Sequence, residues 1–252
     1  MPFLEAFWPI AIAPFIGSFL GTLVLRLPKG ESVVGGRSVC PECGHGLGVF
    51  DLVPVLSWVS LRGRCRYCGA AIPPFYPAIE LGALGVAVWA ALAAPDVPLW
   101  QSCLLGWTLL TLACIDAWKY LLPDVLTLPL LLAGLLVALV FDPDVLSARL
   151  AGAVFGFGLF WALRISYRAW RRREGLGGGD LKLLAAAGAW VGVEGIPSVI
   201  LIAALSGLAG AVLRSRVTGK ALGGRTRIPF GLFLALGIWL IWLYGPLIPL
   251  AG

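Results

Sequence analysis

The sequence predicts an all-α protein that crosses a membrane about eight times and carries a zinc-ribbon-like cysteine loop after the first crossing. Hydrophobic residues make up 60% of the 252 residues and charged residues 13%, whereas a soluble domain is about half apolar and about a quarter charged. The apolar residues form blocks long enough to cross a bilayer, and the basic residues gather in alternate connections. This topology explains the net charge of +6, so we expect a lipid bilayer and no nucleic acid as partner.

Eight apolar blocks define the predicted spans, near 7–25, 79–94, 99–116, 124–141, 148–166, 181–194, 196–213 and 229–249. The second and sixth are short, because one crossing needs about 20 residues. No basic segment precedes the first block and no small-residue cleavage site follows it. We therefore expect this block to be a retained helix and not a cleaved signal peptide.

The basic residues predict the orientation of these spans. They lie in loop 26–78 and in the connections 117–123, 167–182 and 214–228, as Arg26, Lys29, Arg37, Arg62, Arg64, Arg66, Lys119, Arg168, Arg171, Arg172, Arg173, Lys182, Arg214, Arg216, Lys220, Arg225 and Arg227. The alternate connections are acidic, with Arg149 just after one of them. Because basic loops stay in the cytoplasm, we expect these four segments inside and both termini outside.

Loop 26–78 contains two CxxC pairs, Cys40-Pro-Glu-Cys43 and Cys65-Arg-Tyr-Cys68. Each CxxC turn directs two thiolates toward one point, and two turns complete a tetrahedral site. Disulfides are the alternative, but a cytoplasmic loop is kept reduced. We predict a structural zinc site of four cysteines. His45 could replace one thiolate, although four cysteines leave it no required role.

Few acidic residues lie within or beside the apolar spans: Glu80, Asp116, Asp124 and Asp180. An ionisable group at membrane depth is costly, so each is a functional candidate. The predicted topology places the three aspartates at the cytoplasmic face. Gly177, Gly178 and Gly179 precede Asp180, and glycines allow an unwound backbone or a close approach to another chain.

Two facing carboxylates share one proton and can therefore hydrolyse an amide by general acid and base catalysis. The ionised group takes a proton from water, and the protonated group donates to the carbonyl oxygen and to the leaving amine. Spacing alone leaves three possible pairs among these aspartates. It also leaves ordinary roles open: Asp124 and Asp180 could only begin helices, and Asp116 could be a solvated helix end beside Lys119.

The order and spacing of many short motifs resemble the type IV prepilin peptidase family, also called prepilin leader peptidase/N-methyltransferases. The motifs are Gly17-Ser18-Phe19-Leu20, Arg26-Leu27-Pro28, Arg37-Ser38, the CxxC pairs, Ser57-Trp58, Leu61-Arg62-Gly63-Arg64-Cys65-Arg66, Tyr76-Pro77, Glu80-Leu81, Ile115-Asp116, Leu121-Leu122-Pro123-Asp124, Gly179-Asp180-Leu181-Lys182-Leu183, Gly188-Ala189-Trp190 and Ile228-Pro229-Phe230-Gly231. The resemblance covers nearly the whole chain.

The resemblance implies an intramembrane aspartic protease of the GxGD class, with Gly177-Gly178-Gly179-Asp180 as that motif. It implies Asp116 and Asp180 as the catalytic pair, with Asp124 and Lys182 in supporting positions. Family members cut type IV prepilins and type II secretion pseudopilins after a glycine, at the cytoplasmic end of the substrate's apolar helix. Many then methylate the new N-terminus with S-adenosylmethionine, and Glu80 is the candidate for binding the amine.

The resemblance also implies a division of the chain and a location. Residues 1–25 form the first transmembrane helix, 26–78 the zinc loop with a methyltransferase role, and 79–252 the protease domain. The protein is expected in the bacterial inner membrane.

Gly21, Asp51 and Leu232 depart from the residues common in the family at these positions, and none of them belongs to the aspartate pair or the four cysteines.

Two other functions fit parts of the pattern. A peptidase without methyltransferase activity would keep the zinc loop for stability or docking. A transporter or membrane scaffold would explain broken spans and buried acids, but it would be built from repeats, and the two halves of the chain show none.

Overall fold

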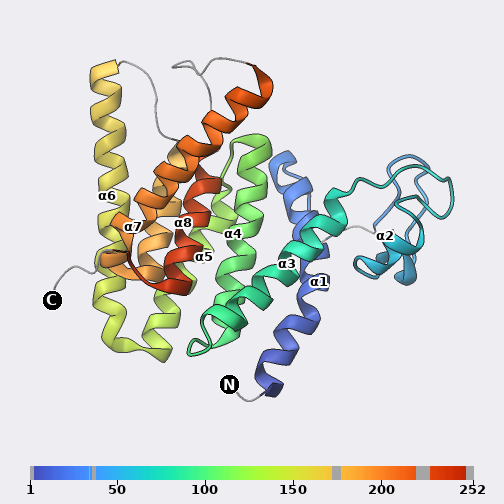
Figure 1. The fold of residues 1–252 in the computed structure, drawn as a ribbon, viewed down its shortest axis with the longest axis horizontal. Coiled ribbons are helices and arrows are strands. Elements are labelled where there is room, and N and C mark those ends of the chain that lie inside the picture. Colours follow the sequence, from blue (N-terminus) through green and yellow to red (C-terminus); the bar gives the residue numbers. More distant parts are fainter. Residues whose placement is uncertain (1–2, 34, 36–37, 172–176, 220–227, 248–252) are drawn as a thin grey trace. The chain divides into compact units, whose positions relative to one another are not determined.

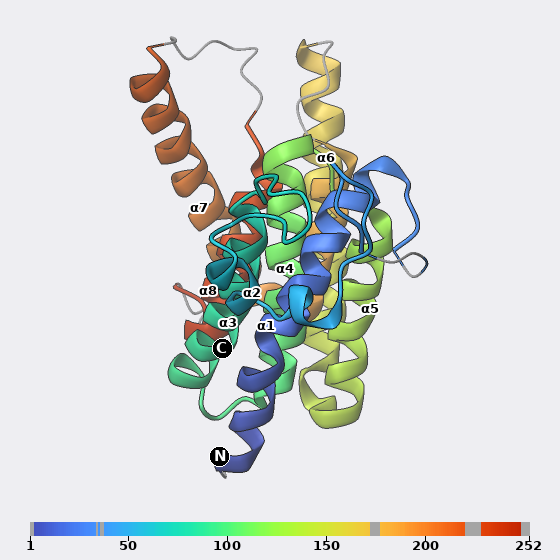
Figure 2. The ribbon, with the colours of Figure 1, turned by 90° about the vertical axis from the view of Figure 1, so that its right-hand side faces the viewer.

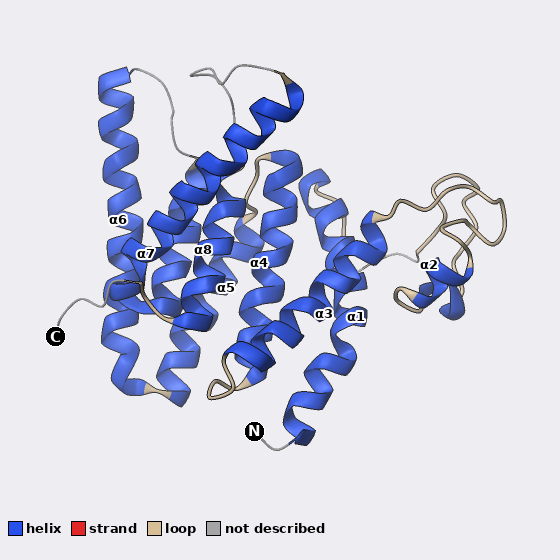
Figure 3. Ribbon diagram, in the orientation of Figure 1, coloured by secondary structure: helices blue, strands red, loops and turns tan. Residues whose placement is uncertain are grey.

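The computed structural model describes residues 3–33, 35, 38–171, 177–219 and 228–247 (Figure 1). Within these ranges every regular element is a helix, as predicted (Figure 3). Several residues that set the predicted orientation lie outside the described ranges: Arg37, Arg172, Arg173, Lys220, Arg225 and Arg227. The described chain forms two compact units, residues 1–111 and 112–252, which divide within helix α4.

The first unit is built on two long helices, α1 and α3. Its elements are α1 (Phe3–Arg26), η1 (Leu27–Lys29), η2 (Val49–Leu52), α2 (Leu56–Ser60), α3 (Phe75–Ala93) and the first part of α4 (Leu99–Lys119). The backbones of α1 and α3 touch, because a Cβ at Gly17 would lie 2.5 Å from the Cα of Glu80. The indole N–H of Trp107 on α4 donates to the carbonyl of Ala83 on α3, at 2.9 Å.

The second unit is a bundle around α7. Its elements are the end of α4, α5 (Asp124–Phe141), η3 (Pro143–Val145), α6 (Leu146–Arg171), α7 (Gly178–Thr218) and α8 (Phe230–Tyr244). Helix α7 packs against α5, α6 and α8 (Figures 1 and 2). The turn between α5 and α6 lies at one end of this unit, and α7 and α8 begin at the other end (Figure 1).

Helix α7 is broken in two at Gly192, where the backbone adopts φ 71° and ψ 177°. The first half runs antiparallel to α6, since Gly188 lies against Gly152 and Leu184 against Gly156. The second half returns along α8, since Val199 lies against Gly237 and Gly210 against Phe233. The two halves are the predicted sixth and seventh spans, and only a residue without a Cβ adopts this conformation readily.

Small residues let the helices of this unit approach closely. A Cβ at Gly188 would lie 2.1 Å from the carbonyl carbon of Gly152, so the two backbones are in contact. Packing of this kind is typical of helices in membranes, where apolar side chains gain little by leaving lipid. The buried Trp190 donates its indole N–H to the carbonyl of Leu130 on α5, at 2.8 Å.

The prediction of an all-α, multi-span fold is confirmed. Within the described residues, six helices are long and apolar enough to cross a membrane, with α7 counted once, and α8 is a shorter apolar helix. Helix α3 begins at Phe75, before the predicted start at 79, and α8 ends at Tyr244, before the predicted end at 249. The loop carries only short helical turns between Val49 and Ser60.

Candidate active site

Asp116, on the last turn of α4, is bound by the beginning of α8. Its side chain is buried, with the residue 5% exposed, and its Oδ2 accepts a hydrogen bond from the backbone N–H of Leu232 at 3.0 Å. The N–H of Gly231 also donates to this carboxylate. The first N–H groups of a helix have no partner within the helix and favour negative charge. Asp116 is therefore not the solvated helix end that its position beside Lys119 allowed.

Asp180, on the first turn of α7, is half-buried and lies close enough to Asp116 for the two charges to interact. Its Oδ2 accepts a hydrogen bond from the N–H of Gly177 at 3.2 Å. This local bond fixes the carboxylate at the helix start. Two residues that are 64 positions apart in the sequence thus meet at one end of the second unit.

Leu122 fills the space beside the two aspartates. Its side chain is buried between two glycines: a Cβ at Gly179 would lie 2.7 Å from its Cβ, and a Cβ at Gly231 would lie 2.8 Å from its Cδ1. The Gly231 position would also bring a Cβ within 3.0 Å of Asp116 Oδ2. Both glycines are thus required for the close approach of their helices to the segment that follows α4.

Asp124 points to a different partner. Its Oδ2 lies 2.6 Å from the Nζ of Lys182, and both side chains are well exposed. Asp124 is also the first residue of α5, directly after Pro123. The residue therefore begins one helix and links it to the first turns of α7, at the same end of the unit as the aspartate pair.

This geometry suits the hydrolysis of an amide. Two carboxylates with interacting charges provide one proton acceptor and one proton donor. Backbone N–H groups hold each carboxylate in place. An arrangement of this kind can activate a water molecule and protonate a leaving amine.

The four cysteines of the loop form a cluster in the first unit. Their sulfur atoms all lie within 4.8 Å of one another, and the Sγ atoms of Cys40 and Cys68 are 3.8 Å apart. Thiolates around a tetrahedral ion, at about 2.3 Å each, lie about 3.8 Å from one another. All six cysteines are free, and the four sulfur atoms of the loop converge on one point, as a metal site requires. The cluster could hold a metal ion.

The two CxxC turns have the same backbone conformation. Gly44 and Gly69, with φ 68° and 73°, follow the two pairs, and each donates its N–H to the backbone carbonyl of the first cysteine of its own pair at 2.9 Å. The backbone N–H groups of Cys43 and Glu42 lower the pKa of Cys40 to about 7. A lowered pKa favours the thiolate, which is the form that binds metals.

Asp51 and His45 make further contacts within this loop. Burial opposes ionisation of Asp51, but hydrogen bonds from Arg66, at 2.7 Å, and from the N–H of Gly48 lower its pKa. The ring of His45 stacks on that of Tyr67, with centroids 3.7 Å apart, so His45 lies outside the cysteine cluster.

Glu80 lies near the start of α3 in the first unit, 7% exposed. Its Oε2 accepts a hydrogen bond from the N–H of Val55 at 2.7 Å. Val55 adopts φ 61°, a strained conformation for a β-branched residue. Glu80 therefore fixes the segment between the two CxxC pairs, a contact that the sequence did not indicate.

The sequence also did not indicate the residues that hold Asp116. Gly231 and Leu232 stand 115 and 116 positions further along the chain, and their contribution is two backbone N–H groups. Pro229 marks the start of a helix and could have suggested exposed N–H groups there. Leu122 lies in the motif Leu121-Leu122-Pro123-Asp124, but the sequence did not show that its side chain fills the space beside the aspartates.

Comparison with known proteins gives consistent matches over most of the chain. The sequence profile of the Bacterial Peptidase A24 N-terminal domain matches residues 12–94, and that of the Type IV leader peptidase family matches residues 103–212. No solved structure matches the chain.

The curated relatives carry the name prepilin leader peptidase/N-methyltransferase. One from Burkholderia pseudomallei is 44% identical over 217 residues, covering 84% of this chain and 68% of the relative. One from Aeromonas hydrophila is 41% identical, with 91% of this chain and 87% of the relative covered. One from Pseudomonas aeruginosa is 35% identical, with 94% and 89% covered.

Proposed function

The chain belongs to the prepilin leader peptidase/N-methyltransferase family, and from this premise we propose that it cleaves type IV prepilins or related pseudopilins and then N-methylates the product. The observation that carries the peptidase proposal is the meeting of Asp116 and Asp180 at one end of the second unit. We infer that these two residues are the catalytic pair.

Cleavage follows from the chemistry of this pair. The ionised carboxylate takes one proton from water while the water oxygen bonds to the carbonyl carbon of the peptide. The protonated carboxyl donates its proton to the carbonyl oxygen, and the tetrahedral carbon then loses the amine, which leaves with a proton from the pair. The products are a free carboxylate on the leader and a free α-amine on the pilin. Cleavage after a glycine would allow the substrate backbone to approach closely.

The location of the site follows from the distribution of charge. Basic residues gather in the connections at the end of the bundle that holds Asp116 and Asp180, which supports a cytoplasmic position for the pair. The chain would then span the bacterial inner membrane with both termini outside. The substrate's apolar helix would lie in the same bilayer, with its leader in the cytoplasm.

Methylation would act on the amine that cleavage releases. The nitrogen lone pair of the α-amine bonds to the methyl carbon of S-adenosylmethionine. The carbon–sulfur bond breaks with its electron pair on sulfur, which leaves S-adenosylhomocysteine, and the methylated nitrogen releases one proton to water. S-adenosylmethionine is thus a second substrate, consumed once for each pilin.

The cysteine cluster would hold a structural zinc ion. Cys40, Cys43, Cys65 and Cys68 supply four soft thiolate ligands at tetrahedral spacing, which suits zinc. Four protein ligands leave no open position for a substrate, so zinc would only cross-link the two CxxC turns. A loop of this size has too small a core to fold alone, which is why such a cross-link is needed.

The aspartate assignment is tested by cleavage of a purified prepilin in liposomes. Asp116→Asn and Asp180→Asn should each lower the rate by about 10²- to 10⁴-fold, while the proteins remain folded. Asp124→Asn is the matched control, because its pairing with Lys182 at the exposed surface contributes about 1 kcal/mol or less. An active Asp116→Asn together with an inactive Asp124→Asn would show that the pair is wrongly assigned.

A further inference from the structure

A short apolar segment of the cysteine loop is exposed on the first unit. It comprises η2 and α2, residues 49–60, and its four most exposed apolar side chains are Val49 at 81%, Phe50 at 82%, Leu56 at 68% and Val59 at 60%. Leu56 and Val59 are three residues apart on α2, so they lie on one face of that helix. Exposed apolar side chains that gather in this way mark a contact with another protein or with a membrane.

The segment lies beside the two long helices of the unit and not beyond their ends. Val55, directly before α2, donates its N–H to Glu80 on α3 at 2.7 Å. Ser18 on α1 bonds the same carboxylate, and the backbones of α1 and α3 touch at this level. Ser18 lies eight residues before the end of α1 and Glu80 five residues after the start of α3, or about 12 Å and about 8 Å along the helices. Val55, and with it the start of α2, is therefore level with the membrane-spanning parts of both helices.

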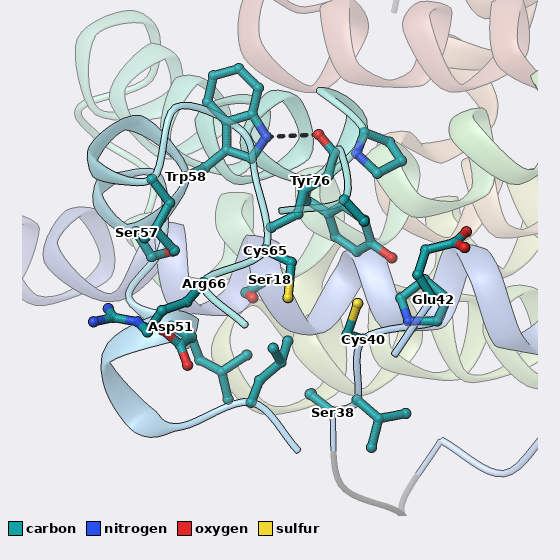
Figure 4. Close-up of a pocket in the computed structure, with 18 of the residues that line it drawn as sticks. Ser18, Ser38, Cys40, Glu42, Asp51, Ser57, Trp58, Cys65, Arg66 and Tyr76 are labelled. Carbon is teal, nitrogen blue, oxygen red and sulfur yellow. Dashed lines mark hydrogen bonds and ion pairs between the residues drawn. The ribbon is translucent and has the colours of Figure 1, made fainter. Parts of the chain in front are cut away.

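The first CxxC turn lies elsewhere in the loop. Figure 4 shows the pocket that the loop forms with α1 and α3: Ser57 and Asp51 lie on one side of this view and Glu42 on the other, with Ser18 between them. Glu42 is exposed and directly precedes Cys43. It therefore provides a reference position in the same loop, away from the apolar segment.

The charges in and after this segment suit a lipid surface. Its one charged residue, Asp51, is shielded: the side chain is 6% exposed and pairs with Arg66 at 2.7 Å. Arg62 and Arg64 follow α2 within four residues and are exposed. Anionic headgroups attract guanidinium groups and repel carboxylates. The segment thus offers lipid its apolar side chains and two free-standing cations, while its carboxylate is already paired.

We propose that residues 49–60 are a membrane anchor that lies in the leaflet on the side of the loop, the cytoplasmic one in the orientation proposed above. Phe50, Leu56 and Val59 contact lipid chains just below the headgroups, and Arg62 and Arg64 reach the phosphates. Interfacial segments lie about 5–10 Å into the boundary between headgroups and acyl chains, which agrees with the level of the contacts to α1 and α3. The anchor fixes the height of the cysteine loop beside these helices.

Photolabelling of the wild-type chain by lipid tests this inference. The full chain is reconstituted in liposomes of phosphatidylethanolamine and phosphatidylglycerol, with a trace of phospholipid that carries a benzophenone on its acyl chain, and labelled residues are located by mass spectrometry. Label on Phe50 and Leu56 should be within about threefold of that on Leu132 and Leu136, which are exposed on α5, and at least about tenfold above that on Glu42. Label on Phe50 and Leu56 at or below the level on Glu42 would overturn the inference.

A second measurement identifies what covers the segment. Phe50→p-benzoylphenylalanine is irradiated in the same liposomes with purified prepilin present, and Glu42→p-benzoylphenylalanine is the matched control. Adducts at position 50 should be with phospholipid and at least about tenfold more abundant than those at position 42. Adducts mainly with prepilin, or with a second copy of the chain, would show that a protein covers the segment and would overturn the anchor. Both measurements report contact with lipid, so they are independent of whether the chain cleaves or methylates.

Discussion

At the scale of single residues, the position of Asp116 depends on two N–H groups that are far along the chain. The first turn of α8 donates to the carboxylate, and the absence of a side chain at Gly231 lets that turn come close. The carboxylate can thus be misplaced without any change to Asp116 itself. Reaction rates respond strongly to such changes, because a shift of about 1 Å can cost about 100-fold.

Gly231→Ala should therefore impair cleavage while the fold persists. The added Cβ would lie 3.0 Å from Asp116 Oδ2 and 2.8 Å from Leu122 Cδ1, and both atoms are ends of side chains that can move. We expect the cleavage rate to fall about 10- to 100-fold with little change in the thermal unfolding midpoint. Leu236→Ala, on the exposed side of the same helix, is the control. Wild-type rates in Gly231→Ala would show that the α8 contact does not position Asp116.

At the scale of elements, the second unit depends on backbones that touch. The contact between α6 and the first half of α7 involves backbone atoms on both sides, at Gly152 and Gly188. Backbone atoms cannot yield as the end of a side chain can. Overpacking at such a contact costs about 1–3 kcal/mol or more.

Two substitutions on α6 test this contact. Gly152→Ala would place a Cβ 2.6 Å from the carbonyl carbon of Gly192, so the unfolding midpoint in detergent should fall by several degrees. Gly158→Ala, on the same helix, has open space around its Cβ and should be neutral or slightly stabilising. Equal midpoints for the two variants would mean that the close approach does not contribute to stability.

The break in α7 gives a separate prediction. Gly192 adopts φ 71° and ψ 177°, a region that is essentially restricted to glycine. Gly192→Ala should cost about 1–3 kcal/mol through backbone strain, although the nearest atoms to its Cβ lie at 3.9 Å, in ordinary contact. Thermal unfolding measures this cost, and a midpoint at or above the wild-type value would show that the chain turns there without strain.

At the scale of the whole molecule, the cysteine cluster and the aspartate pair belong to different compact units. The cysteine cluster lies in residues 1–111, and the aspartate pair lies in residues 112–252. The family profiles divide the chain at a similar place, matching residues 12–94 and 103–212. This division predicts that one activity can be lost while the other remains.

Metal removal tests the separation. Cys65→Ser, or extraction of the metal with a chelator, should open the cysteine cluster and release the two turns that it cross-links. We expect methylation to fall at least about tenfold and cleavage to stay near the wild-type rate. Cys103→Ser, a buried thiol on α4 outside the cluster, controls for the loss of a cysteine. Equal loss of both activities would mean that the units act as one.

The helices and the metal cluster could be predicted from the sequence, because both depend on composition and on the spacing of residues close together in the chain. Apolar blocks predict the helices, since a bilayer leaves the backbone few other choices. The two CxxC pairs predict the metal cluster, since each pair fixes its own turn. Gly192 lies three residues before the predicted gap between the sixth and seventh spans, so the sequence predicted a reversal of the chain in this region but not the residue at which the helix breaks.

The tertiary structure decided what depends on contacts between distant segments. From spacing alone three aspartate pairs were possible, and the fold brings Asp116 to Asp180 while Asp124 binds Lys182. Asp116 and Glu80 both accept hydrogen bonds from backbone N–H groups, at the start of α8 and at Val55. Almost every residue type carries such a group, so its identity in the sequence does not reveal these contacts. A sequence records side chains and their order along the chain, so it determined the helices and the cysteine cluster. Which backbone groups face a carboxylate is fixed only when the helices pack.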